Sequence, residues 1–226
     1  MILHIETATD ICSVVLADQG VVIAEKTSPP IRDHASSLAV FIDEVLKEAN
    51  VKPADLKAIA VSKGPGSYTG LRIGVSTAKG FCYALNIPLI AIATTQSMAQ
   101  QFYLQYPDYN GYVVPLLDAR RMEVYGAIYN SQLEEIHPIV AEVLHENSFA
   151  FQTQYNYTLI GSGTTKSKSI FENQQQLHFN EHFSVSAIGL VKPALKAFQE
   201  QTFEDVAYFE PFYLKDFVSP HFKSEN

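Results

Sequence analysis

Cysteine, long apolar runs and targeting signals are scarce in this sequence. It has two cysteines, Cys12 and Cys82, which both lie in apolar patterns and do not form a Cys-x-x-Cys pair. Buried thiols in a reducing compartment are the natural interpretation. No apolar run approaches the length of a membrane span, and the N-terminus lacks the basic segment and long apolar core of a signal peptide. We therefore expect a cytoplasmic protein that does not enter a membrane.

Positive charge is also scarce. The 226 residues carry 16 Lys and Arg against 24 Asp and Glu, which gives a formal net charge of −8. An acidic chain without a basic run is poorly suited to grip nucleic acid unaided, so a role near RNA would need a basic partner. Hydrophobic residues make up 47% and aromatic residues 12%, which indicates an ordered globular protein of one large or two small domains.

The most informative stretch is KAIAVSKGPGSYTGLRIGVSTAKGFCYALN, residues 57–86. A short apolar run typical of a strand leads into GPG at 64–66, which is turn chemistry, and then into a pattern of helical period. Ser67 and Thr69 are candidate N-caps for a helix that begins near Gly70. Such a loop offers amide groups to an anion, but it lacks the Lys-Ser or Lys-Thr of a Walker phosphate loop.

The predicted helix carries small residues every four positions, at Gly70, Gly74 and Ala78, beside an apolar face. Glycine inside a helix costs about 1 kcal/mol against alanine, so Gly74 indicates close packing. The stripe packs either on the chain's own sheet or on a helix of another protein, and its geometry alone favours the first alternative. Arg72 opposes the helix dipole, so it is either an ordinary solvated arginine or one that meets an anionic partner.

The chain before this stretch reads as three strands and one helix. Short turns join three segments rich in Ile, Val and Leu, which predicts an antiparallel meander with strands at 2–7, 11–17 and 21–26. Glu6 ends the first strand; it is either a catalytic or nucleotide-site carboxylate or, more commonly, a solvated acid. A helix is expected over 33–50 with Asp33 as its cap, and its apolar face is wider than a single sheet would hide.

The second half repeats this order of elements. A strand at 88–93 and a helix at 95–104 precede YPDYNG at 106–111, the most turn-rich linker in the sequence. After it we expect strands at 113–118, 123–130 and 138–144, a helical stretch at 147–154, a strand at 157–160, GSG at 161–163 opening a helix, a helix at 185–201 that Pro193 kinks or restarts, an extended aromatic segment at 208–218 that packs on a lobe, and a frayed tail at 219–226. Asp118 then corresponds to Glu6. The repetition predicts two related α/β lobes, residues 1–105 and 106–226.

Several motifs together resemble one family. They are ILHIETAT at the start, GPGSYTGLRIG at 64–74, ALNIPLI at 84–90, DARRMEVY at 118–125, GSG at 161–163 and PFYLK at 211–215. This combination is similar to the TsaB (YeaZ) family over nearly the whole chain. The resemblance implies an α/β, duplicated actin/Hsp70/sugar-kinase-like (ASKHA, ribonuclease H-like) fold with two lobes.

The resemblance also implies a function. Members of the TsaB family are non-catalytic partners of TsaD, the enzyme that places a threonylcarbamoyl group on the adenosine beside the anticodon of certain tRNAs. The resemblance implies a heterodimer with TsaD, joined by TsaE, a homodimer when the chain is alone, and contact with tRNA only through the complex. It implies no cofactor, no metal and no catalytic residue in this chain, and it does not support a glycoprotease.

By the same resemblance, the interface with TsaD lies on the two helices of the first lobe. The residues implied are His34, Leu38, Phe41, Ile42, Val45, Tyr68, Thr69, Gly70, Arg72, Ile73, Gly74, Thr77 and Ala78. TsaD-like relatives bind their catalytic metal through a His-x-x-x-His pair just after the segment similar to ALNIPLI. Here those positions read Thr94 and Met98, which cannot replace two imidazoles at a hard ion.

Three alternatives stay open. The chain could be an enzyme, a peptidase or a nucleotide hydrolase, that depends on Glu6 or Asp118. The loop 63–69 could bind nucleotide without hydrolysing it. Finally, His178 and His182 are four residues apart, the zinc-binding spacing on a helix, but the segment LHFNEHF alternates and offers no third ligand, which favours surface histidines.

Overall fold

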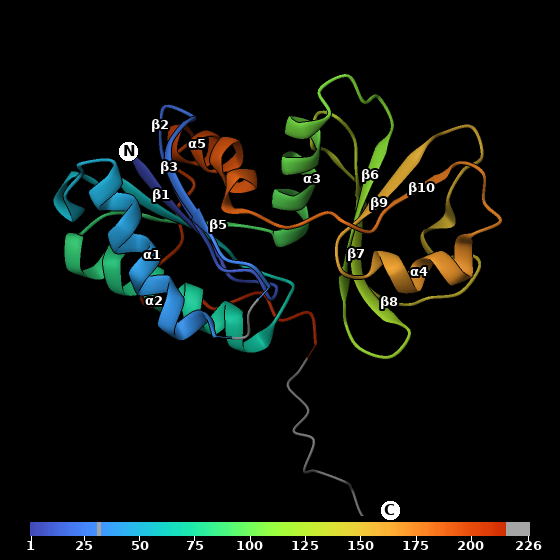
Figure 1. The fold of residues 1–226 in the computed structure, drawn as a ribbon, viewed down its shortest axis with the longest axis horizontal. Helices are drawn as coiled ribbons and strands as arrows, with labels where there is room; N and C mark the ends of the chain where they lie inside the picture. The colour runs from blue at the N-terminus through green and yellow to red at the C-terminus, as the bar shows by residue number, and fades with distance from the viewer. Residues whose placement is uncertain (31–32, 216–226) are drawn as a thin grey trace, which may run out of the picture.

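The computed structural model describes residues 1–30 and 33–215. Two five-stranded mixed sheets, each in its own lobe, lie side by side, and the helix labelled α3 stands between them (Figure 1). The elements in chain order are β1 (Ile2–Glu6), β2 (Ser13–Asp18), β3 (Val21–Thr27), α1 (His34–Glu48), η1 (Pro53–Asp55), β4 (Ala58–Ser62), α2 (Tyr68–Leu85), β5 (Leu89–Ile92), α3 (Thr94–Gln105), β6 (Tyr112–Asp118), β7 (Glu123–Tyr129), β8 (Glu135–Val143), η2 (Ser148–Ala150), β9 (Tyr157–Ile160), α4 (Thr164–Phe171), β10 (Leu177–Asn180), η3 (Ala187–Leu190) and α5 (Val191–Gln199).

The first sheet has the strand order β3-β2-β1-β4-β5. The three strands joined by short turns pair antiparallel, as predicted for a meander. The strands reached through the helices α1 and α2 pair parallel with the strand before them, β4 with β1 and β5 with β4. Every residue of β1 and β4 is buried, because helices cover both faces of the sheet.

The second sheet repeats this topology. Its order, β10-β9-β6-β7-β8, is that of the first sheet once β6 is matched to β1 and β9 to β4. The pairing is also the same, because β6, β7 and β8 form an antiparallel meander and β9 and β10 continue it in parallel. The prediction of two related lobes is therefore confirmed.

The packing of the helices crosses the boundary predicted at residue 105. Met98, Ala99 and Phe102 of α3 lie in a core cluster with side chains of β6 and β7 in the second sheet. Conversely, Leu190, Val191 and Ala194 of η3 and α5 pack on the face of the first sheet opposite α1 and α2, with Val15 and Ile90. The division into residues 1–105 and 106–226 stays a prediction about folding units, whereas in the packing each lobe contributes one helical segment to the other.

One predicted helix is wrong and several boundaries shift. The stretch 147–154 contains only the three-residue 3-10 helix η2, because Phe149 and Ala150 have φ of 63° and 46° and a helix cannot continue through such angles. The buried ring of Phe149 packs in the second core and holds the chain in this turn. The helix expected at 185–201 is divided into η3 and α5, and Pro193 lies in the first turn of α5, where proline is tolerated.

The remaining predictions concern the cysteines and the C-terminal segment. Cys12 and Cys82 are free and buried, and burial raises the pKa of both thiols to about 11. The part of the aromatic segment that the structure describes packs on the first lobe, where the Phe212 amide donates to the carbonyl of Lys63 at 2.7 Å. The tail at 219–226 lies outside the described residues. Within those residues, no helix combines the length and the apolar character needed to span a bilayer.

Candidate functional site

The helices α1 and α2 lie together on one face of the first sheet (Figure 1). Each begins at a side-chain cap that the sequence predicted. Asp33 accepts a hydrogen bond from the Ser36 amide, and Ser67 accepts one from the Gly70 amide at 3.3 Å. Of the two cap candidates for α2, Ser67 is therefore the cap, and Thr69 lies inside the helix.

The small-residue stripe of α2 packs against the chain's own first strand and the turn that follows. A methyl group added to Gly70 or Gly74 would lie far inside van der Waals contact with Thr7, at its carbonyl and hydroxyl oxygens respectively. The Thr7 hydroxyl also donates to the Gly70 carbonyl at 2.8 Å, and Ala78 is fully buried in the first core. The stripe therefore packs on the chain's own sheet and not on a helix of another protein.

Seven of the thirteen residues expected at a partner interface are buried in the lobe, namely His34, Leu38, Ile42, Val45, Gly70, Gly74 and Ala78. They hold the two helices on the sheet, so the wide apolar face of α1 needs no partner to cover it. The other six are half-buried or exposed: Phe41, Tyr68, Thr69, Arg72, Ile73 and Thr77. These six border the outer surface of the two helices.

Other residues of that outer surface carry little signal in the sequence. Val40 on α1 is 51% exposed and Tyr83 on α2 is 86% exposed. Gly80 faces open space, because a methyl group added there would meet no atom within 4 Å. Arg72, Ser76, Gly80 and Tyr83 follow one another at helical spacing, so α2 shows solvent an outer row with a small residue at its middle. The spacing of these residues opposite the apolar positions is the one signal that could have found them.

Glu6 is not the solvated acid that is commonest at a strand end. Its side chain is fully buried, and one carboxyl oxygen accepts hydrogen bonds from the Ala8 amide at 2.7 Å and the Ser62 hydroxyl at 2.8 Å. The other oxygen has no hydrogen-bond partner among the described residues. Burial raises the pKa of Glu6 from 4.5 to about 7, against the opposing effect of these hydrogen bonds. A carboxylate so enclosed cannot meet a substrate without a rearrangement of the loops that cover it.

Thr94 and Met98 occupy the first turns of α3 and are fully buried. Met98 packs in the core of the second lobe, and its methyl group lies where a side chain on Gly161 would have to be. The Thr94 hydroxyl has no hydrogen-bond partner in the part of the chain that the structure describes. The two positions thus carry an aliphatic hydroxyl and a thioether in close packing.

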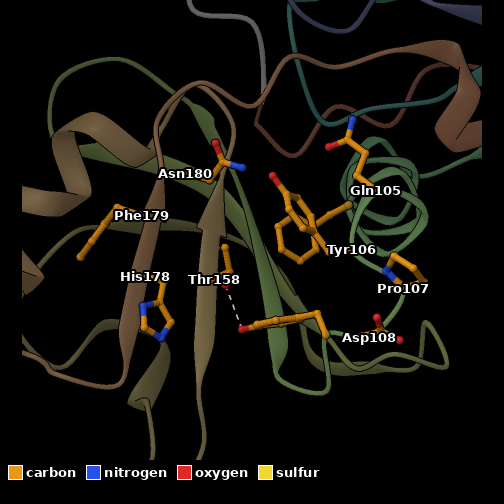
Figure 2. A pocket seen from close by; sticks show the side chains of 10 residues that line it. Gln105, Tyr106, Pro107, Asp108, Thr158, His178, Phe179 and Asn180 are labelled. Carbon is orange, nitrogen blue, oxygen red and sulfur yellow. Dashed lines mark hydrogen bonds between the residues drawn. The ribbon is translucent and has the colours of Figure 1, made fainter.

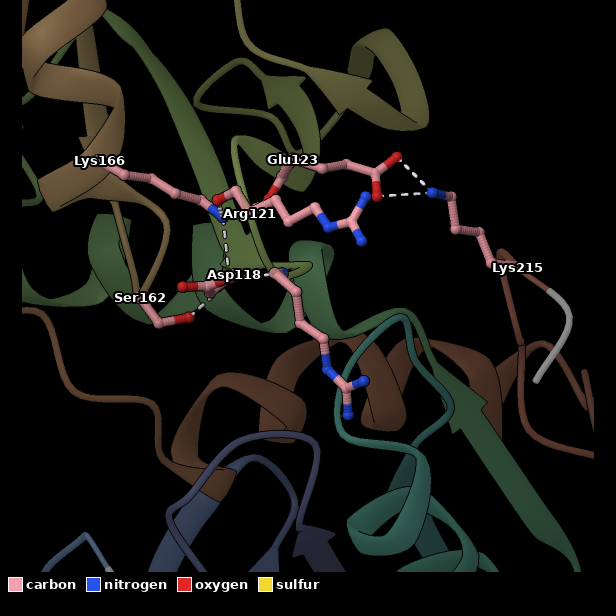
Figure 3. A network of polar contacts seen from close by, with 7 residues as sticks. Asp118, Arg121, Glu123, Ser162, Lys166 and Lys215 are labelled. Carbon is pink, nitrogen blue, oxygen red and sulfur yellow. Dashed lines mark hydrogen bonds and ion pairs between the residues drawn. The ribbon is translucent and has the colours of Figure 1, made fainter. Parts of the chain in front are cut away.

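Asp118, the counterpart of Glu6, lies on the surface. Its carboxylate accepts hydrogen bonds from the Arg120 amide at 2.7 Å and from the Lys166 ammonium at 2.8 Å, and its own amide donates to Ser162 (Figure 3). The Asp118 side chain is 51% exposed, whereas that of Lys166 is only 16% exposed. This carboxylate is therefore held in an ion pair at the mouth of the GSG loop.

The glycine loop at 63–69 is covered by the C-terminal segment. A side chain on Gly64 would collide with the carbonyl of Phe212, and the rings of Tyr213 and Tyr68 pack with their centroids 4.8 Å apart. The Ser67 amide already donates to the Ala8 carbonyl at 2.7 Å. An anion at this loop would have to displace the C-terminal segment.

The two histidines at zinc-like spacing do not form a pair. His178 is exposed on strand β10 and His182 is exposed in the turn that follows, so the expectation of surface histidines is confirmed. Within residues 1–30 and 33–215, no three His, Cys, Asp or Glu side chains group closely enough to hold a metal ion. His178 instead lines a cavity of about 600 Å³ between the end of α3 and the edge of the second sheet, with Tyr106, Tyr109 and Asn180 (Figure 2).

Comparison with known proteins identifies the family. The tRNA threonylcarbamoyladenosine biosynthesis protein TsaB of Escherichia coli is 30% identical over 228 residues, a match that covers 96% of each chain. The chain belongs to the TsaB family. The Bacillus subtilis protein of the same name is 34% identical over 140 residues, which are 61% of this chain and 59% of the relative. A family model described as TsaD, tRNA N6-adenosine threonylcarbamoyltransferase, matches residues 16–224.

Solved structures agree on the fold of this TsaB-family chain. YeaZ from Pseudomonas aeruginosa has a TM-score of 0.84 at 24% identity, over 94% of this chain and 99% of the other. The activator of 2-hydroxyisocaproyl-CoA dehydratase from Clostridium difficile has a TM-score of 0.52 at 8% identity, over 88% and 95% of the two chains. The predicted two-lobed ASKHA fold is therefore confirmed.

Proposed function

We propose that this chain is the non-catalytic partner of a TsaD transferase in the cytoplasmic formation of threonylcarbamoyladenosine in tRNA. The observation that carries the proposal is the division of α1 and α2 into two faces. Their inner faces pack in the core of the first lobe, while Val40, Arg72 and Gly80 are exposed to solvent on the outer faces. Two adjacent helices with small and apolar residues facing outward are a surface on which a partner helix can pack.

The absence of catalysis is the second part of the proposal. It is supported by Thr94 and Met98, whose side chains offer no imidazole at the position where the TsaD resemblance expects one. It is also supported by the enclosure of Glu6, the acid on which a hydrolase in this lobe would depend. The contribution of this chain would then be to hold TsaD in an active form, with TsaE joining the pair. Contact with tRNA would occur only in the complex, and the chain would form a homodimer when TsaD is absent.

The test is a reconstitution of tRNA threonylcarbamoylation. TsaD, TsaE and the adenylate-forming enzyme are combined with tRNA, with and without this chain, and the TsaD mixture is run on size exclusion. We expect modification to require the chain and a stable heterodimer to elute. Modification that is indifferent to the chain, with no complex formed, would contradict the proposal.

A matched pair of variants places the surface. Val40→Arg puts a charge on the outer face of α1, whereas Val143→Arg puts one on the exposed edge strand β8 of the second lobe, where Val143 is 63% exposed. We expect Val40→Arg to weaken the heterodimer and lower modification, and Val143→Arg to leave both unchanged. Equal effects of the two variants would contradict the assignment of the surface to the two helices.

A further inference from the structure

The turn between β6 and β7 places two arginines in strained backbone. Arg120 and Arg121 have φ of 71° and 46°, in the left-handed region that glycine and asparagine adopt most easily. The Glu123 amide closes the turn on the Arg120 carbonyl at 3.0 Å. An arginine side chain does not stabilise left-handed backbone as a glycine or an asparagine would. The strain at these two positions therefore indicates that the arginine side chains have a function.

Neither arginine uses its charge within the described chain. Both residues are exposed, and no hydrogen bond or ion pair joins either guanidinium to another residue in 1–30 or 33–215. The whole sequence has four arginines, and these two are adjacent. Together with Lys166 and Lys215 they outnumber the two acids of the same network, Asp118 and Glu123, so the turn is locally positive on a chain of net charge −8.

The half-buried Lys166 holds the turn in place. The Lys166 ammonium donates to the Asp118 carboxylate, to the Arg121 carbonyl at 3.1 Å and to the Glu123 carbonyl (Figure 3). All three of these hydrogen bonds from the Lys166 ammonium go to groups of the turn, so they fix its conformation. The two guanidinium groups are thereby presented from a rigid base, which lowers the entropy lost when they bind an anion.

The turn lies on the same side of the molecule as the first turn of α2. Lys215 pairs with Glu123 at 2.5 Å, and two residues earlier Tyr213 packs on Tyr68. Tyr68 in turn carries Arg72, whose guanidinium lies 5.2 Å from the ring centroid. The C-terminal segment thus connects the arginine turn of the second lobe to the helix of the proposed TsaD surface.

We propose that Arg120 and Arg121 bind phosphate groups of the RNA backbone when the chain is paired with TsaD. The inference rests on the proposed function. A guanidinium matches a phosphate oxygen pair in geometry and charge, and contacts of this kind position an RNA without reading its sequence. The arginines stand at an open hairpin tip and line neither the cavity beside the end of α3 nor the smaller hollow lined by Asn156 and Gln176, so an extended polyanion fits them better than an enclosed nucleotide. The remaining acidic surface explains why the chain would not bind RNA without its partner.

The test measures binding of a tRNA to the purified heterodimer with TsaD at several salt concentrations. Arg120→Gln/Arg121→Gln removes both charges. Lys52→Gln/Lys57→Gln is the matched control, since these two exposed lysines both lie just before β4 in the first lobe. Size exclusion first establishes that each variant still pairs with TsaD. We expect the arginine variant to bind tRNA about tenfold more weakly, with a salt dependence reduced by about two counterions, and the control to bind as the parent does.

A second variant separates binding from folding. Arg120→Asn/Arg121→Gly relieves the left-handed backbone, so we expect an unchanged Tm or one raised by about 3 °C, together with the same loss of tRNA affinity. Full tRNA affinity in either arginine variant would overturn the proposal. It would also be overturned if the variants lost TsaD but not tRNA, which would make the arginines a protein contact, or if only ADP binding changed, which would make them a nucleotide site. Failure of the parent chain to pair with TsaD would overturn the proposed function, and this inference, which rests on it, would fall with it.

Discussion

The two lobes share one topology, but the acid at the carboxyl end of the first strand is buried in one lobe and exposed in the other. In the first lobe that end carries Glu6, which is fully enclosed and touches only neutral groups. In the second lobe it carries Asp118, which lies on the surface in an ion pair with Lys166. A duplicated fold therefore preserved the strand order while the chemistry at equivalent positions diverged.

The difference follows from what covers each strand end. In the first lobe the long helix α2 and its glycine loop lie directly on the chain after β1, and the C-terminal segment covers the loop. In the second lobe the short helix α4 leaves the strand end open and supplies a cation in its first turn. The strand end of the first lobe is thus closely packed, and that of the second lobe carries exposed charge. This difference agrees with the proposals that the first lobe contacts TsaD and the second contacts phosphate.

The largest effect expected is from Gly70→Ala. The added methyl group would meet the backbone carbonyl after β1, which cannot move aside as a side chain would. We expect a loss of roughly 3 kcal/mol or more in the free energy of unfolding, measured by urea denaturation.

Two further glycines sharpen the comparison. Gly163→Ala in the second lobe would meet mainly side-chain carbons of Leu116 and Val124, so its cost should be smaller, about 1–2 kcal/mol. Gly80→Ala, which meets nothing, should stabilise α2 by about 1 kcal/mol. If all three substitutions behaved alike, the packing difference between the lobes would be disproved.

The second prediction concerns pH. The pKa of Glu6 is raised from 4.5 to about 7, so the folded state holds its proton more tightly than the unfolded state does. The resulting stability is complete below about pH 4.5 and is lost as the pH rises through 7, by about 3 kcal/mol in all. Glu6→Gln should remove this fall in the free energy of unfolding between pH 5 and 8, as measured by denaturant titration at each pH.

Asp118→Asn is the control for that experiment. Its ion pair is half exposed on the carboxylate side, so the variant should change stability by less than about 1 kcal/mol. The fall in stability toward alkaline pH should persist unchanged. If the fall in the free energy of unfolding vanished in Asp118→Asn and persisted in Glu6→Gln, the titrating acid would be Asp118 and the assignment to Glu6 would be wrong.

Lys166→Met should have an intermediate effect. The variant keeps the length of the side chain but removes the donor to Asp118 and to two backbone carbonyls of the arginine turn. We expect a loss of about 1–3 kcal/mol and faster amide exchange at residues 119–123. Unchanged exchange there would show that the turn holds its shape without the lysine.

The smallest effect expected is from Lys215→Ala. The Lys215–Glu123 pair crosses from the C-terminal segment to the second lobe, but the lysine side chain is 50% exposed. Its removal should cost under about 1 kcal/mol, and less at high salt. A loss that is large and independent of salt would mean that the segment ties the lobes together more firmly than this contact explains.

The sequence could predict the fold because its signals are local. Short turns, alternating strands, the caps Asp33 and Ser67 and the repeated order of elements each follow from neighbouring residues. Which sheet a helix packs against depends on tertiary contacts, not on neighbouring residues. The sequence therefore could not predict that α3 packs on the second sheet and α5 on the first. The helical stretch at 147–154 failed for a related reason, because the buried ring of Phe149 fixed the turn through tertiary contacts.

The candidate surface was predicted in part. Periodicity found the two helices, but a glycine stripe reads the same whether it packs inward or outward, and only the Thr7 contacts decide for the inside. The burial of Glu6 depends on which loops close over β1, which no spacing encodes. Gly80 could be found only by its helical spacing opposite the apolar positions, because an outward glycine has no neighbours that specify it.

The outward position of Gly80 provides the most direct measurement. Gly80→Arg fits the isolated lobe, since nothing lies near its side chain, but it places a long cation at the middle of the outer row of α2. Calorimetric titration of this variant with TsaD should show an affinity at least about 100-fold below that of the parent, with an unchanged circular dichroism spectrum and a Tm that is not lowered. An affinity equal to that of the parent would contradict the claim that the outer face of α1 and α2 is where TsaD binds.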